Sequence, residues 1–190
     1  SNKVNVIKIL PGGVVTAKDT AEIQLDENGE FVRNPEEDIV KVAVVERHQG
    51  TGNVACGFLK GYGIKEGAVA LSIAHDSHNI IVVGVSDEEM EFAVNSLIAQ
   101  EGGMVLVREG KVLESMPMPI AGLMSDQSGE WVDEKLTAIH AKAYEELGIA
   151  GDVEPVMTLC FMSLAVIPEV KLTDMGLFDV TTFSFIPVEA

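Results

Sequence analysis

Short apolar runs and apolar–polar alternation recur along this chain, and both patterns favour β-strands. Residues 4–9 alternate loosely and precede a Pro-Gly-Gly break that ends regular structure. Three later runs are almost wholly apolar, as is typical of strands buried on both faces. The pattern therefore predicts strands at residues 4–9, 40–46, 68–73 and 80–85.

Two turn signals predict β-hairpins. Asn28-Gly29 supplies the positive φ angles that a tight turn needs, and it lies between two β-type segments. Glu109-Gly110 separates a second pair of such segments in the same way. The predicted hairpins pair residues 21–25 with 30–33 and residues 104–108 with 111–115.

Helical patterning is clearest in two places. Ser86 and Glu89 form an S-x-x-E capping box, in which each side chain can satisfy a free backbone N–H. Ser128 is placed to cap a second helix, with Gly148 as the residue just beyond its end. The side chains expected to face inward are Met90, Ala93, Val94, Leu97 and Ile98 in the first helix and Val132, Leu136, Ile139, Ala143 and Leu147 in the second.

Strands outnumber helices in this prediction, and the two are interleaved along the chain. The expected fold class is therefore α+β, with mixed β-sheet layers and flanking helices. No low-complexity linker divides the chain, and the nearest break is the acidic, proline-containing stretch at residues 34–38. We expect an N-terminal β segment at residues 1–36, a strand and a hairpin, that leads into one α+β domain at residues 37–190.

The composition narrows the classes of function. Lys and Arg total 13 against 30 Asp and Glu, so the net charge is −17, which argues against a nucleic-acid partner and against an anionic membrane surface. The longest uncharged apolar stretch, residues 156–168, is too short to cross a bilayer. Cys56 and Cys160 stand far apart with no C-x-x-C motif, so we expect reduced thiols and a cytoplasmic location.

The densest polar cluster is Ala-His-Asp-Ser-His-Asn at residues 74–79, between two predicted strands. Its imidazoles, carboxylate, hydroxyl and amide could contact a polar heterocycle, position a water or form an interface. The alternatives are a turn whose side chains cap local backbone groups, or a metal site. His-x-x-His alone is weak support for zinc, because no third ligand lies close in sequence.

A second candidate loop, Arg-His-Gln-Gly-Thr-Gly-Asn at residues 47–53, directly follows a predicted strand. Its glycines permit close backbone approach, so its N–H groups could cradle an anion or a carbonyl, although a simple tight turn fits equally well. The glycine spacing is not that of G-x-G-x-x-G, and no Gly-Lys-Ser/Thr follows.

Several catalytic motifs are absent from the sequence. It contains no G-x-S-x-G, no H-E-x-x-H, and no H-x-E with P-C-x-x-C. None of the four histidines forms a His-x-His pair, and His140 is expected to be a half-buried packing residue of the second helix. Six methionines beside apolar residues are expected to fill the core: Met104, Met116, Met118, Met124, Met157 and Met162.

Long strings of residues resemble the C-terminal domain of the adenine deaminases, in the amidohydrolase superfamily. They are Val-Val-Glu-Arg-His with Gly-Thr-Gly at 44–52, Ala-His-Asp-Ser-His-Asn-Ile at 74–80, and Pro-Met-Pro-Ile-Ala-Gly-Leu-Met-Ser at 117–125. Shorter strings at residues 157–159, 166–169 and 171–174 extend the resemblance, which covers nearly the whole chain.

The resemblance implies hydrolysis of adenine to hypoxanthine and ammonia in purine salvage. In that family a manganese or iron centre in a (β/α)8 barrel activates the attacking water. A barrel needs about 250 residues, more than this chain has, and its His-x-His ligand pair is missing here. We therefore expect no metal, no bound cofactor and no catalytic residue in this chain, which alone should be inactive and should have the barrel of the same protein as its partner.

Two roles for the domain remain open. It completes the active site around the substrate adenine, or it is a non-catalytic oligomerisation or ligand-binding module within a homo-oligomer. A free-standing ligand-binding protein that has borrowed the domain is a third reading. The residues expected to complete a site are His48, Thr51, Gly52, His75, Asp76, Ser77, His78 and Asn79.

Overall fold

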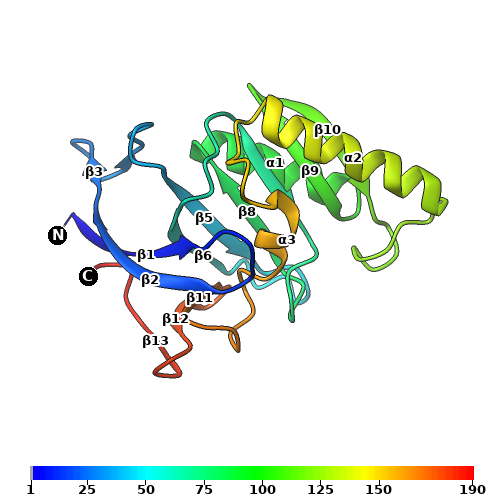
Figure 1. The fold of residues 1–190 in the computed structure, drawn as a ribbon. Helices are drawn as coiled ribbons and strands as arrows, with labels where there is room; N and C mark the ends of the chain where they lie inside the picture. The colour runs from blue at the N-terminus through cyan, green and yellow to red at the C-terminus, as the bar shows by residue number, and fades with distance from the viewer. Residues whose placement is uncertain (1) are drawn as a thin grey trace.

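The computed structural model describes residues 2–190, and an eight-stranded sheet forms its centre (Figure 1). The strand order is β10-β9-β7-β8-β5-β6-β1-β2, and every neighbouring pair is antiparallel except β1 with β6. The strands are β1 (Lys3–Ile9), β2 (Thr16–Glu22), β5 (Ile39–Val45), β6 (Val54–Lys60), β7 (Ala68–Leu71), β8 (Ile80–Gly84), β9 (Gly103–Arg108) and β10 (Lys111–Pro117).

Smaller elements cover this sheet. One three-stranded sheet and one hairpin accompany the helices, and the mixture confirms the α+β prediction. These elements are β3 (Gln24–Leu25), β4 (Phe31–Val32), β11 (Val170–Thr173), β12 (Gly176–Asp179), β13 (Ser184–Phe185), α1 (Asp87–Ala99), α2 (Gly129–Glu145) and α3 (Pro155–Cys160).

The two faces of the sheet are buried differently. Helix α1 crosses from β8 to β9 and packs on small side chains such as Ala68 and Ala70, which let the helix approach closely. Helices α2 and α3 and the sheet β11-β12-β13 cover the other face, where Leu59, Leu71 and Leu106 belong to the largest core cluster. The sheet is therefore the middle layer, which explains why its central strands read as continuous apolar runs.

Strands β1 and β2 belong to the predicted N-terminal segment at residues 1–36, whose first residue lies outside the described residues. Strand β1 pairs with β6 in the central sheet, and β2 pairs with β1. The Asn28-Gly29 turn joins β3 to β4, so the predicted hairpin is confirmed in its central part. Phe31 of this hairpin packs edge-on against Phe58 at a centroid distance of 5.0 Å.

Helix α1 confirms one half of the predicted capping box. The Ser86 hydroxyl accepts a hydrogen bond from the Glu89 N–H at 3.2 Å, whereas the Glu89 carboxylate accepts from the Gly110 N–H at 3.3 Å. Met90, Ala93 and Leu97 are buried as predicted, but Ile98 is exposed. The prediction for Ile98 was wrong because the next residue after Leu97 lies about 100° around the helix.

Several elements were not predicted: β6, α3, most of β2, and the C-terminal strands β11, β12 and β13. In β6, Cys56 and Gly57 interrupt the apolar pattern that marks the other strands. A β-carbon at Gly57 would lie 3.6 Å from the Leu172 side chain of β11, an ordinary van der Waals distance, so β11 packs directly over this part of β6.

The methionine prediction is partly wrong. Met104, Met116, Met118 and Met162 are buried, but Met124 and Met157 are more than half exposed. Met124 lies in the turn region after β10, and Met157 lies on the outer face of α3, whose buried residues are Pro155, Val156, Leu159 and Cys160. Among the helices of residues 2–190, none combines the length and the apolar character that a bilayer crossing requires.

His140 joins α2 to α3 and is half-buried, as predicted. Its Nδ1 hydrogen-bonds the Leu136 carbonyl at 2.7 Å, and its Nε2 bonds the Glu154 carboxylate. Burial alone would lower the pKa of His140, but the bonds to Glu154 and Leu136 outweigh burial and raise it. Both ring nitrogens face acceptors, so the charged imidazolium is favoured.

A His140→Gln variant should therefore lose stability in a pH-dependent way. A raised folded-state pKa stabilises the fold fully below the unfolded value near 6.5, and the gain disappears as pH rises through the folded pKa. We expect the thermal midpoint of the variant to fall further below the parent at pH 5.5 than at pH 8.5. An equal difference at both pH values would contradict the charged assignment.

Candidate functional site

One end of the central sheet gathers three connections that are far apart in the sequence. We call them the loop cluster: residues 46–53, 74–79 and 117–125. The first joins β5 to β6, the second lies between β7 and β8, and the third follows β10. Val45 at the end of β5 lies opposite Ile80 at the start of β8, so the first two loops lie at the same end of the strands (Figure 1).

Arg47 connects all three parts of the loop cluster. Its Nε donates to the carbonyl of His78 at 2.5 Å, and its Nη2 donates to the carbonyl of Ala121 at 2.8 Å. Its backbone N–H donates to Oδ1 of Asn79 at 3.3 Å. A planar guanidinium can donate in two fixed directions at once, which a lysine cannot do. Arg47 therefore sets the spacing between the loops.

Hydrogen bonds of Ser72 hold the segment 117–125 against the central sheet. The Ser72 hydroxyl donates to the Gly122 carbonyl at 2.5 Å and accepts from the Gly103 N–H at 2.8 Å. Gly122 has φ +73, and a β-carbon there would lie 3.0 Å from the Arg47 guanidinium. A larger residue would strain the backbone and crowd Arg47, so glycine is required at this close approach.

Glu46 closes the first loop from within. Its carboxylate accepts from the N–H groups of His48, Gln49 and Thr51 and from the Thr51 hydroxyl, at 2.5–3.0 Å. These bonds, that from the Thr51 N–H first, lower the pKa of Glu46 to about 2. The loop N–H groups that could have cradled an external anion are thus already occupied by a carboxylate of the same chain.

The segment 74–79 carries two imidazoles in contact. The rings of His75 and His78 lie edge to face with centroids 5.1 Å apart, and His75 also packs on Phe161 at 4.9 Å. The Nδ1 atom of His78 is buried and has no hydrogen-bond partner among residues 2–190. Burial, followed by the nearby charges of His75 and Arg47, lowers the pKa of His78 and favours the neutral ring.

The structure brings most of the predicted site residues together. Nε2 of His48 lies 2.6 Å from the carbonyl oxygen of Ser77, which links the first two loops directly. Asn79 is buried and serves as the acceptor for Arg47, so its role lies in holding the loops. Thr51 bonds only within its own loop in the described part of the chain, and Gly52, at φ +74, makes its turn.

Sequence reasoning missed the residues that hold the loops together: Glu46, Arg47, Ser72 and Gly122. Arg47 opens the second candidate loop, but none of these four residues was expected to complete a site. Glu46 offered one readable signal, since a carboxylate directly before a glycine-rich loop can accept several loop N–H groups. The other contacts depend on strand order, which the sequence does not give.

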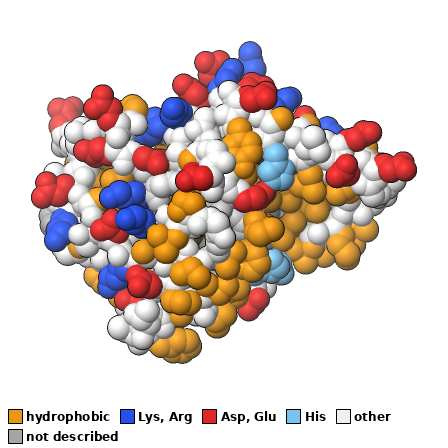
Figure 2. Space-filling view, in the orientation of Figure 1, with side chains coloured by type: hydrophobic (Ala, Val, Ile, Leu, Met, Phe, Trp, Pro, Cys, Tyr) orange, Lys and Arg blue, Asp and Glu red, His pale blue; other side chains and the backbone are white. Residues whose placement is uncertain are grey.

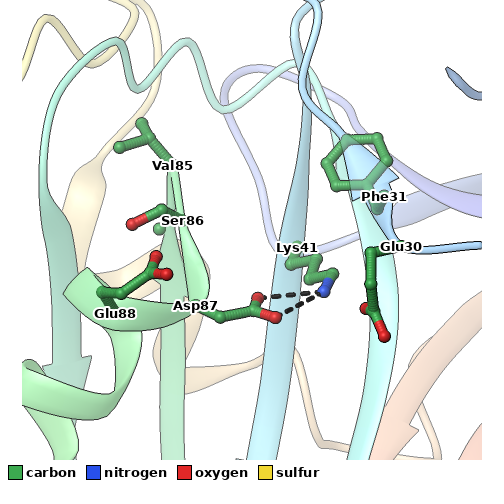
Figure 3. Close-up of a pocket in the computed structure, with 8 residues that line it drawn as sticks. Glu30, Phe31, Lys41, Val85, Ser86, Asp87 and Glu88 are labelled. Atoms are coloured by element: carbon green, nitrogen blue, oxygen red, sulfur yellow. Dashed lines mark hydrogen bonds and ion pairs between the residues drawn. The ribbon is translucent and has the colours of Figure 1, made fainter. Parts of the chain in front are cut away.

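A cavity of about 390 Å³ lies beside the loop cluster, with Glu46, Arg47, Gly50 and Ser72 among its lining residues and Leu97 and Ile98 of α1 on its apolar side. Another hollow, of about 400 Å³, lies away from the cluster near the start of α1 (Figure 3). There the Lys41 ammonium donates to both Asp87 carboxylate oxygens at 2.8–2.9 Å, so the one cation among the described residues that line this hollow is already paired. The loop cluster is the stronger candidate site.

No group of three His, Cys, Asp or Glu side chains within residues 2–190 is arranged to hold a metal ion. The residues present therefore do not fit the iron or manganese that the family resemblance implies. The cluster instead offers groups that make polar contacts. They are the imidazole of His78 and, on exposed residues, the carboxylate of Asp76 and the hydroxyl of Ser77.

A sequence model described as the adenine deaminase C-terminal domain matches residues 13–184. The chain belongs to the adenine deaminase C-terminal domain family. Within this family it is 68% identical over 190 residues to the protein named adenine deaminase 2 of Desulfotalea psychrophila, a match that covers the whole chain and 33% of the relative.

Adenine deaminases of other organisms give the same picture. The chain is 49% identical to that of Ligilactobacillus salivarius, with 100% of this chain and 33% of the relative covered. It is 44% identical to that of Bacillus velezensis, with 98% and 32% covered. The chain thus spans about a third of the length of these curated relatives, and all three strings of the loop cluster lie within the matched family domain.

Proposed function

We propose that this chain acts as the C-terminal domain of an adenine deaminase, and that the loop cluster completes the active site on a catalytic barrel. By the full-length enzyme we mean this chain joined to such a barrel. The relatives are named adenine deaminases and are about three times as long, which supports a catalytic part outside the matched third. The reaction is adenine plus water to hypoxanthine plus ammonia, in purine salvage.

One observation carries the proposal of an active-site role. Arg47 holds together three segments that are far apart in the sequence, and among them lies the His78 ring, whose Nδ1 is buried without a hydrogen-bond partner among residues 2–190. A buried polar atom without a partner costs free energy, about 1–3 kcal/mol, unless a further group satisfies it. Adenine has ring nitrogens and an exocyclic amine that could make this hydrogen bond. A polar group at the mouth of the barrel could make it instead.

The metal belongs in this proposal to the barrel, because residues 2–190 lack a ligand set. Iron or manganese bound there would supply the activated water. This chain would contribute by orienting the base and by excluding bulk water from it. Cytoplasmic location is also part of the proposal, and it is supported by the two free thiols, Cys56 and Cys160.

A His78→Ala variant of the full-length enzyme tests the proposal. We expect kcat for adenine to fall by about tenfold or more, because the base or the barrel mouth loses a positioning contact. His140→Ala is the matched control, since this histidine lies between α2 and α3, outside the loop cluster. Parent-like kcat and KM in a normally folded His78→Ala enzyme would refute the active-site role.

A further inference from the structure

A third cavity, separate from those beside Arg47 and near the start of α1, opens between the loop cluster and the C-terminal sheet. Its volume is about 350 Å³. Asp76 and Ser77 form one side, the 163–166 segment forms another, and the turn between β11 and β12 closes it with Phe178 and Phe185. Asp76 and Ser77 belong to the loop cluster, but the proposed function assigns no role to the other residues that line this cavity.

Ser163 is an unsatisfied polar group at this cavity. The residue is only 7% exposed, and its hydroxyl has no hydrogen-bond partner among residues 2–190. Buried hydroxyls in folded proteins are almost always hydrogen-bonded, because desolvation without a partner is costly. The Ser163 hydroxyl therefore leaves one hydrogen bond unmade at the wall of this cavity.

The charge of the cavity indicates the sign of a group that could make this bond. Asp76 and Asp174 both line it, and neither has a lysine or arginine within ion-pair distance in the described part of the chain. The whole chain carries a net charge of −17. A positively charged hydrogen-bond donor is the complementary group.

The rim of the cavity is apolar and aromatic. Among the lining residues, Met175 is 72% exposed and Phe185 is 51% exposed, and Phe178 lies edge to face with Phe185 at 5.2 Å. In the view of Figure 2, hydrophobic side chains form a broad band across the right and lower parts of the molecule. An aromatic rim beside carboxylates suits a guanidinium, which stacks on rings and donates to carboxylates in the same pose.

We propose that this cavity receives an arginine side chain carried on an apolar segment of the barrel part of the full-length enzyme. The inference rests on the proposed function, since it needs the longer polypeptide. The relatives contain about two thirds of their length outside the matched region, and covalent attachment keeps such a segment at a high effective concentration. The carboxylates of Asp76 and Asp174 favour the positively charged arginine, and the apolar rim contacts the residues on either side of that arginine.

Hydroxyl-radical footprinting of the full-length enzyme tests the inference, with Met175 as the reporter. A docked segment should slow oxidation of Met175 roughly tenfold relative to the same residue in the isolated chain, because oxidation follows exposure. Val112, exposed on the edge strand β10, is the control position that should not change. Equal rates at Met175 in both samples would overturn the inference.

Two further arms separate the possible occupants and the two proposals. Protection that persists on dilution supports the barrel segment, whereas protection lost on dilution would mean a second copy and would overturn the inference. Asp174→Asn should restore most of the Met175 oxidation, while Asp133→Asn, an exposed acid on α2, should not. Footprinting does not depend on turnover, so protected Met175 with parent-like kinetics in His78→Ala would refute only the active-site role.

Discussion

Replacing Gly67 with alanine is expected to destabilise this chain by about 3 kcal/mol or more. Gly67 has φ +65, and a β-carbon there would lie 1.9 Å from the carbonyl oxygen of Val107 and 3.0 Å from the Leu147 side chain. The carbonyl belongs to β9 in the central sheet, so it cannot move without breaking strand pairing. Backbone strain and a steric clash therefore act together.

Gly110→Ala is a matched control for this prediction. Gly110 also has φ +65, but a β-carbon there would meet no atom within 4 Å. Its substitution isolates the cost of the left-handed conformation, about 1–2 kcal/mol. Urea unfolding of both variants measures the difference. Equal losses at the two positions would show that the contact with Val107 contributes nothing.

Replacing Arg47 with methionine is expected to reduce kcat of the full-length enzyme for adenine by about a hundredfold. Methionine keeps much of the side-chain volume but removes the donors to His78 and Ala121, so the second and third loops lose their common anchor. Displacement of a positioning group by about 1 Å can cost that much in rate.

Arg47→Lys distinguishes geometry from charge. Lysine keeps the positive charge, but its single ammonium cannot reproduce the two fixed donor directions of the guanidinium. We expect kcat to stay well below the parent value in this variant too. Hydrogen exchange at the 120–124 amides should rise in both variants, and unchanged exchange with unchanged kcat would refute the anchoring role.

Local patterns predicted the elements well where local physics decides the structure. Ser86 and Ser128 mark the starts of α1 and α2, and Asn28-Gly29 marks a tight turn, because capping and positive φ angles depend on neighbouring residues. Strand β6 was missed because Gly57 packs against a distant element, β11. Patterns within a window cannot register that partner.

The sequence allowed several residues of the candidate site to be identified, but not the contacts between them. His75 and His78 were identified from a dense polar string, and the structure places their rings together. The anchoring role of Arg47 was not predicted, because its partners, His78 and Ala121, are 31 and 74 positions away. The strand order β7-β8-β5, which brings them together, follows from tertiary packing.

Ammonia release from adenine, measured with added manganese or iron, tests the central proposal most directly. Three samples are compared: this chain alone, the full-length enzyme, and the full-length enzyme with both His75→Ala and His78→Ala. We predict no release by the chain alone, full activity in the second sample and at least about tenfold lower kcat in the third. Conversion of adenine by the chain alone, or parent-like kcat in the folded double variant, would contradict the proposal.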